Sequence, residues 1–120
     1  MRFEIIERQG MSIARVKSHH VLIRDVDTAL DLMADAYYQA KTRRLILDAD
    51  AFDPRFFDLS TRLAGDILQK FVTYSVKLAI VGSFSQVTSK SLRDFIRESN
   101  QGTDIFFCNS DDEAVQRLAM

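Results

Sequence analysis

Residues 44–71, RLILDADAFDPRFFDLSTRLAGDILQKF, pass from an apolar run through a loop into an amphipathic pattern. The run Leu45-Ile46-Leu47 is continuously apolar, which is typical of a strand covered on both faces in a parallel sheet. From Leu63 to Phe71 the apolar residues recur three and four positions apart, which indicates a helix with one buried face. A strand, a loop and a helix in this order predict an α/β protein.

The rest of the chain repeats this alternation. Two short runs at residues 3–8 and 11–17, separated by Gln9-Gly10, predict a β-hairpin, because glycine accepts the positive φ of a tight turn. We then expect a helix capped by Asp25 and closed by the cations Lys41, Arg43 and Arg44. Two further strands are expected at 78–81 and 105–108, and the helix between them should begin at Thr88 or Ser89 and stop before Gly102. The last helix should begin with a capping box at Ser110. The prediction is one α/β domain over residues 1–120, with a mixed, mostly parallel sheet, helices packed on it and the hairpin as its antiparallel edge.

Four segments, DLMADAYY, LAGDILQKF, VKLAIVG and SKSLRDFIRESN, resemble a family of small bacterial proteins known only as a domain of unknown function, over residues 3–118. More broadly, the leading hairpin, the alternating helices and strands and the segment Asp58-Leu59-Ser60-Thr61 resemble the STAS module, the sulfate transporter and anti-sigma-factor antagonist family. The resemblance implies a STAS-like fold and a regulatory function in which the domain binds a protein partner. Fold alone does not transfer function, so the residues of the site carry the rest.

The STAS module carries its phosphoacceptor serine or threonine at the start of the helix after the third strand, inside an Asp-Ser-Ser-Gly-like turn. Here Asp58 resembles the aspartate and Ser60 or Thr61 the acceptor, but Arg62 stands where the glycine is expected. Two interpretations stay open. Ser60 is either a helix cap, whose hydroxyl accepts the amide of residue 62 or 63, or a phosphoacceptor that regulates partner binding.

Ligands of open α/β sheets bind beyond the carboxyl ends of the strands, so the residues that follow each strand are candidates for a ligand surface. The strand at 78–81 is followed by Gly82, Ser83 and Ser85. Four aromatic residues belong to two loops at the same edge: Phe52, Phe56, Phe57 and Phe84. They either roof a small apolar pocket, form a contact surface, or are buried as ordinary core.

An enzymatic alternative rests on Asp48 and Asp50, because an apolar strand that ends in Asp-x-Asp resembles the haloacid-dehalogenase phosphotransferases. There the first carboxylate attacks phosphorus, the second is the acid and base, Mg²⁺ bridges them, and Lys90 would be the accompanying lysine. Against it, Phe52 replaces a small residue and Asp111-Asp112 are explained as first-turn carboxylates of a helix. We favour a non-enzymatic module without a cofactor.

The amino-acid composition limits the classes of partner that we expect for this chain. With 16 basic and 17 acidic residues the net charge is −1, so the chain as a whole does not attract nucleic acid or an anionic membrane. Cys108 lies in an apolar strand run and is expected to be a core residue, and adjacent His19-His20 point to opposite faces of an extended strand, so we predict no metal. The N-terminus lacks the apolar core of a signal peptide, which favours the cytoplasm. We also expect a homodimer, because an exposed edge hairpin or aromatic surface needs a cover.

Overall fold

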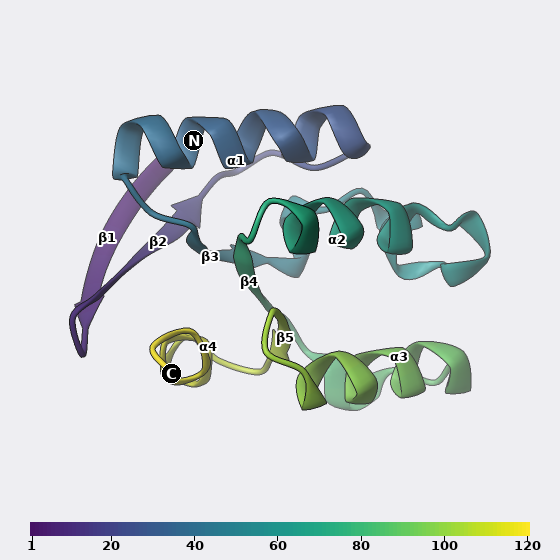
Figure 1. Ribbon diagram of the computed structural model, residues 1–120. Coiled ribbons are helices and arrows are strands. Elements are labelled where there is room, and N and C mark those ends of the chain that lie inside the picture. Colours follow the sequence, from purple (N-terminus) through teal and green to yellow (C-terminus); the bar gives the residue numbers. More distant parts are fainter.

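The computed structural model describes residues 1–120 and contains five strands and four helices (Figure 1). Their order along the chain confirms the predicted alternation. The elements are β1 (Arg2–Arg8), β2 (Met11–Lys17), α1 (Val26–Ala40), β3 (Arg44–Asp48), α2 (Leu63–Thr73), β4 (Lys77–Val81), α3 (Lys90–Gln101), β5 (Ile105–Cys108) and α4 (Asp111–Leu118). None of the four helices combines the length and the apolar composition that a membrane span requires.

The five strands form one sheet in the order β1-β2-β3-β4-β5, so neighbours in the sheet are also consecutive strands of the chain. β1 and β2 pair antiparallel, and every other pair is parallel. The hairpin turn has positive φ at both central residues, 52° at Gln9 and 78° at Gly10, as a type I′ turn requires. The mixed sheet with a single antiparallel edge, implied by the STAS resemblance, is confirmed.

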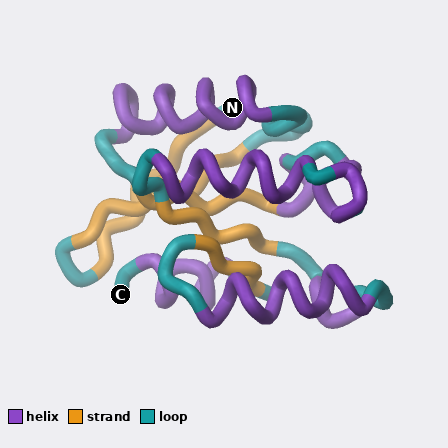
Figure 2. The backbone as a smooth tube through the Cα atoms, turned by 45° about the vertical axis from the view of Figure 1, so that its right-hand side comes forward, coloured by secondary structure: helices purple, strands orange, loops and turns teal.

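Helices cover the two faces of the sheet unequally. α1, α2 and α3 follow one another across one face, and α4 alone covers the other (Figures 1 and 2). The apolar core on the first face contains 21 buried residues and that under α4 contains 9, so most of the buried apolar surface lies under the first three helices. Alternate residues of β5 join the two cores, with Phe107 on the first face and Phe106 under α4.

Polar side chains set the helix boundaries. Asp25 and Thr28 form a reciprocal capping box at the start of α1, and the Ser89 hydroxyl accepts the amide of Leu92 at the start of α3, both as predicted. In α4 the Ser110 hydroxyl accepts the Glu113 amide, but the Glu113 carboxylate reaches one residue further back, to the amide of residue 109. Only one of the two hydrogen bonds of the predicted capping box is therefore formed.

The basic cluster after α1 does not close the helix in the expected way. α1 ends at Ala40, and Lys41 is a left-handed cap residue with φ 57° whose amide donates to the Tyr37 carbonyl. Arg44 already belongs to β3, and Arg43 lies over the Tyr37 ring, 4.6 Å from its centroid. The prediction that all three cations close the helix was wrong, because only Lys41, the cap residue, lies at the end of α1.

Cys108 is a buried residue of β5, as predicted. Burial raises the pKa of its thiol to about 11, with a smaller contribution from the nearby Glu113 carboxylate. At neutral pH the thiol is therefore protonated and weakly nucleophilic.

The two edge strands of the sheet differ in whether a side chain covers their free backbone groups. At the β5 edge, the Asn100 side chain of α3 accepts the Phe107 amide at 2.7 Å and donates to the Phe107 carbonyl at 3.1 Å. One carboxamide thus replaces a neighbouring strand at the centre of β5. β1 has no such cover, and Ile5 in its middle is 47% exposed. The open edge of the sheet is therefore β1.

Candidate functional site

Two connections at the carboxyl ends of the parallel strands build the candidate site. The chain leaves β3 through three short 3-10 helices, at Ala49–Ala51, Pro54–Phe57 and Leu59–Thr61, before α2 begins. It leaves β4 through a fourth, at Phe84–Gln86. A bridge between Ile23 and Phe52 fixes the first connection against the segment that precedes α1.

An open, mainly apolar depression of about 430 Å³ lies between these connections, and we name it the edge hollow. Seven of its ten lining residues are apolar, and Asp50 and Ser83 are among the polar ones. Its volume is in the range of roughly 300–1,000 Å³ that is usual for ligand sites. Its lining residues are Val21, Ala49, Asp50, Phe52, Pro54, Phe57, Ser83, Phe84, Val87 and Leu92.

The four loop aromatics divide into core and wall. Phe52 and Phe56 are only 2% and 1% exposed, so their assignment to a contact surface was wrong. Their rings pack 4.6 Å apart, in the same apolar core as buried residues of α1 and α2. Phe57 and Phe84 are partly exposed, lie 6.3 Å apart, and form walls of the edge hollow. The alternative in which aromatics line a small apolar pocket therefore fits Phe57 and Phe84, and the buried Phe52 also borders the hollow.

Gly82 has a packing role at this site. A Cβ at this position would lie 2.9 Å from the Ala49 Cβ and 3.0 Å from the Phe84 ring. The glycine therefore allows the two connections to approach each other behind the edge hollow. Of the two serines that follow, Ser83 lines the hollow, whereas Ser85 is exposed outside it.

The hydroxyl pair lies in the last 3-10 turn before α2. The Ser60 hydroxyl donates to the Asp58 carboxylate at 2.6 Å, and the Ser60 amide donates to the same oxygen. These bonds, the side-chain bond first, hold the pKa of Asp58 below its ordinary value. The Thr61 hydroxyl donates to the carbonyl of Asp58 and accepts the amide of Leu63.

Ser60 is therefore not the cap of α2. The residue at the cap position is Arg62, with φ 63° and no capping side chain, and the amide assigned to Ser60 is taken by Thr61. The extra 3-10 turn displaces Ser60 from the helix end, and no pattern of apolar residues signals that turn. Ser60 remains an exposed hydroxyl with a single carboxylate partner, whereas Thr61 is fixed by several backbone bonds.

The residues of the phosphotransferase alternative have separate partners. Asp48 forms a 2.7 Å ion pair with Arg15, and Lys90 pairs with Asp94 along α3. Asp50 lines the edge hollow among apolar residues. The Asp48 carboxylate accepts from the Arg15 guanidinium through Oδ1, and Lys90 is paired within α3 and does not line the hollow with Asp50. The geometry gives the phosphotransferase alternative no support.

The most buried charge of the protein was not among the predicted residues. Arg15 of β2 is 5% exposed and bridges the end of β3 to the start of α4. Its Nη2 donates to Asp48 at 2.7 Å and to Asp111 at 3.0 Å, and its Nε donates to Asp111 at 3.1 Å. Burial opposes the charge, but the bonds from the two carboxylates outweigh it and raise the pKa of Arg15. The missed signal was an arginine inside the apolar run Ile13-Ala14-Arg15-Val16, which required an acidic partner.

Replacement of Arg15 by methionine is expected to lower the free energy of unfolding by about 1–2 kcal/mol at neutral pH. Hydrogen bonds to charged groups contribute about 1.5–3 kcal/mol, but both carboxylates are nearly half exposed and regain water when the guanidinium is removed. Urea denaturation measures the change. The control is Arg97→Met, whose 65% exposed side chain pairs with Asp94 and should change stability by less than about 0.5 kcal/mol. Equal effects of the two substitutions would contradict the structural role of Arg15.

A mixed, mostly parallel sheet covered by helices, with an apolar hollow at its carboxyl edge, defines the class of this protein, a small α/β domain. The chain belongs to the DUF4180 family, a domain of unknown function, whose model matches residues 8–118. No curated protein matches the sequence. Among solved structures, the chain is similar to a crystal structure from Thermotoga maritima described as a "putative anti-sigma factor antagonist", with 10% identity and a TM-score of 0.49, over 99% of this chain and 94% of that chain.

Proposed function

We propose that this protein is a non-enzymatic regulatory module that binds a protein partner through the edge hollow. The observation that carries the proposal is the combination of an apolar depression, walled by Phe57 and Phe84, with the exposed Ser60 just beyond Phe57 in the chain. The expected ligand is a segment of the partner that inserts an apolar side chain into the hollow.

The open shape of the hollow favours a protein over a small metabolite. Small-molecule sites bury most of the surface of their ligand in a concave pocket, whereas the edge hollow is an open depression on the surface. Asp50 and Ser83 both line the hollow and are both exposed, so they are available to backbone groups of a bound segment. An apolar centre with a polar rim is the usual anatomy of a protein–protein interface.

Binding is tested with peptides selected from a random library on the wild-type protein. Val21→Asp adds a carboxylate to the lining of the hollow and should weaken these peptides at least about tenfold, because a charge must then be desolvated. Val72→Asp is the matched control, since Val72 is 43% exposed against 37% for Val21 but lies on α2 outside the hollow. The proposal would be contradicted if every selected peptide bound Val21→Asp as tightly as it binds the wild type.

Ser60 supplies the regulatory element of the proposal. A phosphate there adds nearly two negative charges in place of the hydroxyl that donates to Asp58, so the two groups repel each other. The repulsion should disturb the Asp58 turn beside Phe57 and so change the wall of the edge hollow. Arg62, exposed two residues later, is a cation that the displaced phosphate can reach.

Ser60→Asp is therefore expected to weaken the selected peptides at least about fivefold, whereas Ser60→Ala should leave their affinity within about twofold. Fluorescence anisotropy of labelled peptides measures both. Similar affinities of the two variants would remove the phosphorylation switch from the proposal and leave the edge hollow as an unregulated site. Thermal unfolding of both variants shows whether the fold is intact.

A further inference from the structure

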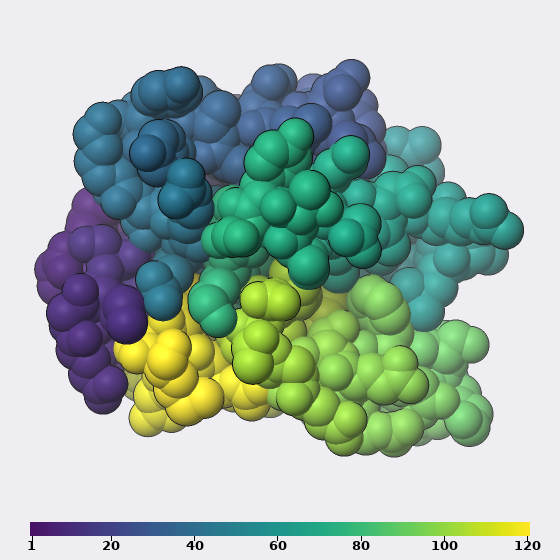
Figure 3. Space-filling view, viewed as in Figure 1, coloured from purple at the N-terminus to yellow at the C-terminus, as the bar shows by residue number.

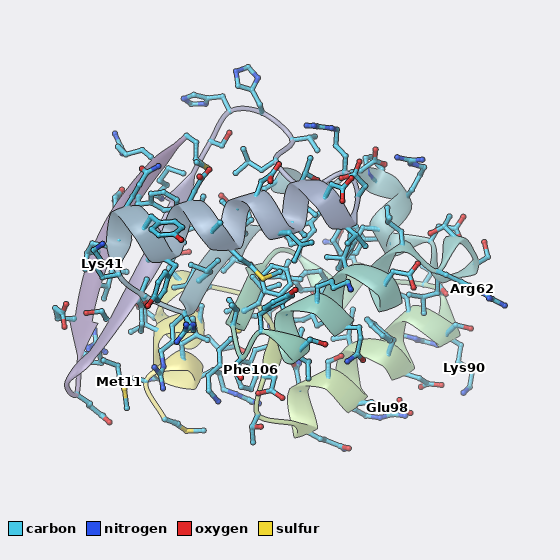
Figure 4. The ribbon with its side chains drawn as sticks, turned by 45° about the horizontal axis from the view of Figure 1, so that its top comes forward. Met11, Lys41, Arg62, Lys90, Glu98 and Phe106 are labelled. Carbon is cyan, nitrogen blue, oxygen red and sulfur yellow. The ribbon has the colours of Figure 1, made fainter.

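A second depression lies at the opposite end of the sheet and has a different chemistry. It has a volume of about 470 Å³ and is lined by the cations Lys41, Arg43, Arg44 and Lys77, with none of its ten lining residues acidic. We name it the basic cleft. Figure 4 shows Lys41 and Met11, which line it, at one end of the molecule, and Arg62 and Lys90 at the other.

Residues of three connections line the basic cleft together with Arg44 and Lys77, the first residues of β3 and β4. The hairpin turn contributes Gly10, the α1–β3 connection contributes Lys41 and Arg43, and the α2–β4 connection contributes Ser75. The blue α1–β3 connection and the purple hairpin meet at this end in the space-filling view (Figure 3). The cleft is therefore a product of topology, and residues far apart in the sequence line it.

The positive charge of the cleft is not neutralised by acidic side chains. None of the six ion pairs in the structure includes a cation of the basic cleft. Lys77 donates to the Thr103 carbonyl at 2.6 Å and Arg44 to the Leu118 carbonyl at 2.8 Å, so their hydrogen-bond partners are neutral. The Leu118 carbonyl, at the end of α4, offers Arg44 only the partial charge of a helix end.

The sheet register places two of these cations next to each other. Arg44 and Lys77 are the first residues of β3 and β4 and lie directly opposite each other in the parallel ladder. Like charges on neighbouring strands repel each other. A bound anion would relieve the repulsion and would meet Lys41 and Arg43 at the same time.

We propose that the basic cleft binds a small anion that carries two linked phosphates. Four cations exceed the charge of a single phosphate, and the volume of the cleft exceeds the space that one such ion fills. The hydroxyl of Ser75, which also lines the cleft, adds a donor for a phosphate oxygen, whereas the Ser12 hydroxyl already donates to the Glu7 carboxylate. The diphosphate is either free or the head of an organic phosphate, whose remainder would extend along Tyr37, shared with a neighbouring apolar groove.

Isothermal titration calorimetry with inorganic phosphate, pyrophosphate and ADP, at low salt and without divalent cations, tests the proposal. Pyrophosphate should bind at least about tenfold more tightly than phosphate, and added salt should weaken it through screening. ADP that binds more tightly than pyrophosphate would identify an organic phosphate, and the reverse order would identify the free diphosphate. Absence of binding by both diphosphates would overturn the proposal.

A matched pair of substitutions locates the binding. Lys41 and Arg62 are both cations with positive φ, at 57° and 63°, so Lys41→Asn and Arg62→Asn make the same charge change at the same backbone conformation, which asparagine tolerates. Lys41→Asn should weaken pyrophosphate at least about fivefold, because it removes one charge from the cleft, and Arg62→Asn should leave it within about twofold. Equal loss in both variants would place the binding outside the basic cleft and overturn the proposal.

Discussion

Replacement of Phe56 by alanine is expected to lower the free energy of unfolding by about 3–5 kcal/mol. The side chain is 1% exposed and its ring packs between those of Phe52, at 4.6 Å, and Phe57, at 4.9 Å. Removal of the ring loses this burial and leaves a cavity between the first connection and α2, which the short 3-10 helices cannot close without losing their own contacts.

Phe57→Ala is the matched control for this prediction. Phe57 is the next residue in the same 3-10 helix but is only partly buried, at the wall of the edge hollow, so its loss should cost about 1–2 kcal/mol. Denaturant unfolding of the two variants gives the comparison. A cost for Phe57→Ala as large as that for Phe56→Ala would contradict the division of the loop aromatics into core and wall.

Replacement of Asn100 by alanine is expected to cost about 2–4 kcal/mol. The substitution removes the partner of both the amide and the carbonyl of Phe107, a residue that is only 3% exposed. Each buried backbone group that loses its partner costs about 1–3 kcal/mol. The loss also opens the centre of β5, which then becomes a second unpaired edge of the sheet.

Hydrogen exchange at the Phe107 amide provides a local measurement beside denaturant unfolding. In the wild type this amide should be protected, and in Asn100→Ala it should exchange through local opening of the β5 edge. Asn109→Ala, at an exposed position directly after β5, is the control and should leave both measurements nearly unchanged. Retained protection of Phe107 in Asn100→Ala would mean that the carboxamide does not replace a strand.

The sequence predicts the elements of this fold because their signals are local. The continuous apolar runs at β3, β4 and β5, the helical spacing in α1 and α2, and the Gln9-Gly10 turn each act within a few residues. The rule that ligand sites lie at the carboxyl ends of parallel strands also placed Phe57, Phe84 and Ser83 at one edge.

The partners of Arg15, the burial of the loop aromatics and the basic cleft depend on long-range contacts, which no local sequence pattern indicates. Arg15 finds its partners 33 and 96 residues away, so its role follows only once the sheet order is known. The division between buried Phe56 and partly exposed Phe57 depends on how the 3-10 turns fold back, and the same turns moved Ser60 away from the start of α2. The basic cleft combines two cations of the α1–β3 connection with the first residues of β3 and β4, and the sequence does not show that Lys77 joins the other three.

The single helix on the α4 face has a consequence for the order in which the protein forms during translation. Each of the first four strands finds its sheet neighbour soon after the ribosome makes it, because sheet order follows chain order. Ile13 and Ile46, in contrast, stay uncovered until α4 has been made, and until then Arg15 has only the Asp48 carboxylate. A nascent chain that stalls before residue 111 therefore displays an apolar sheet face with a half-paired arginine, which is the form of this protein that a chaperone or protease would encounter.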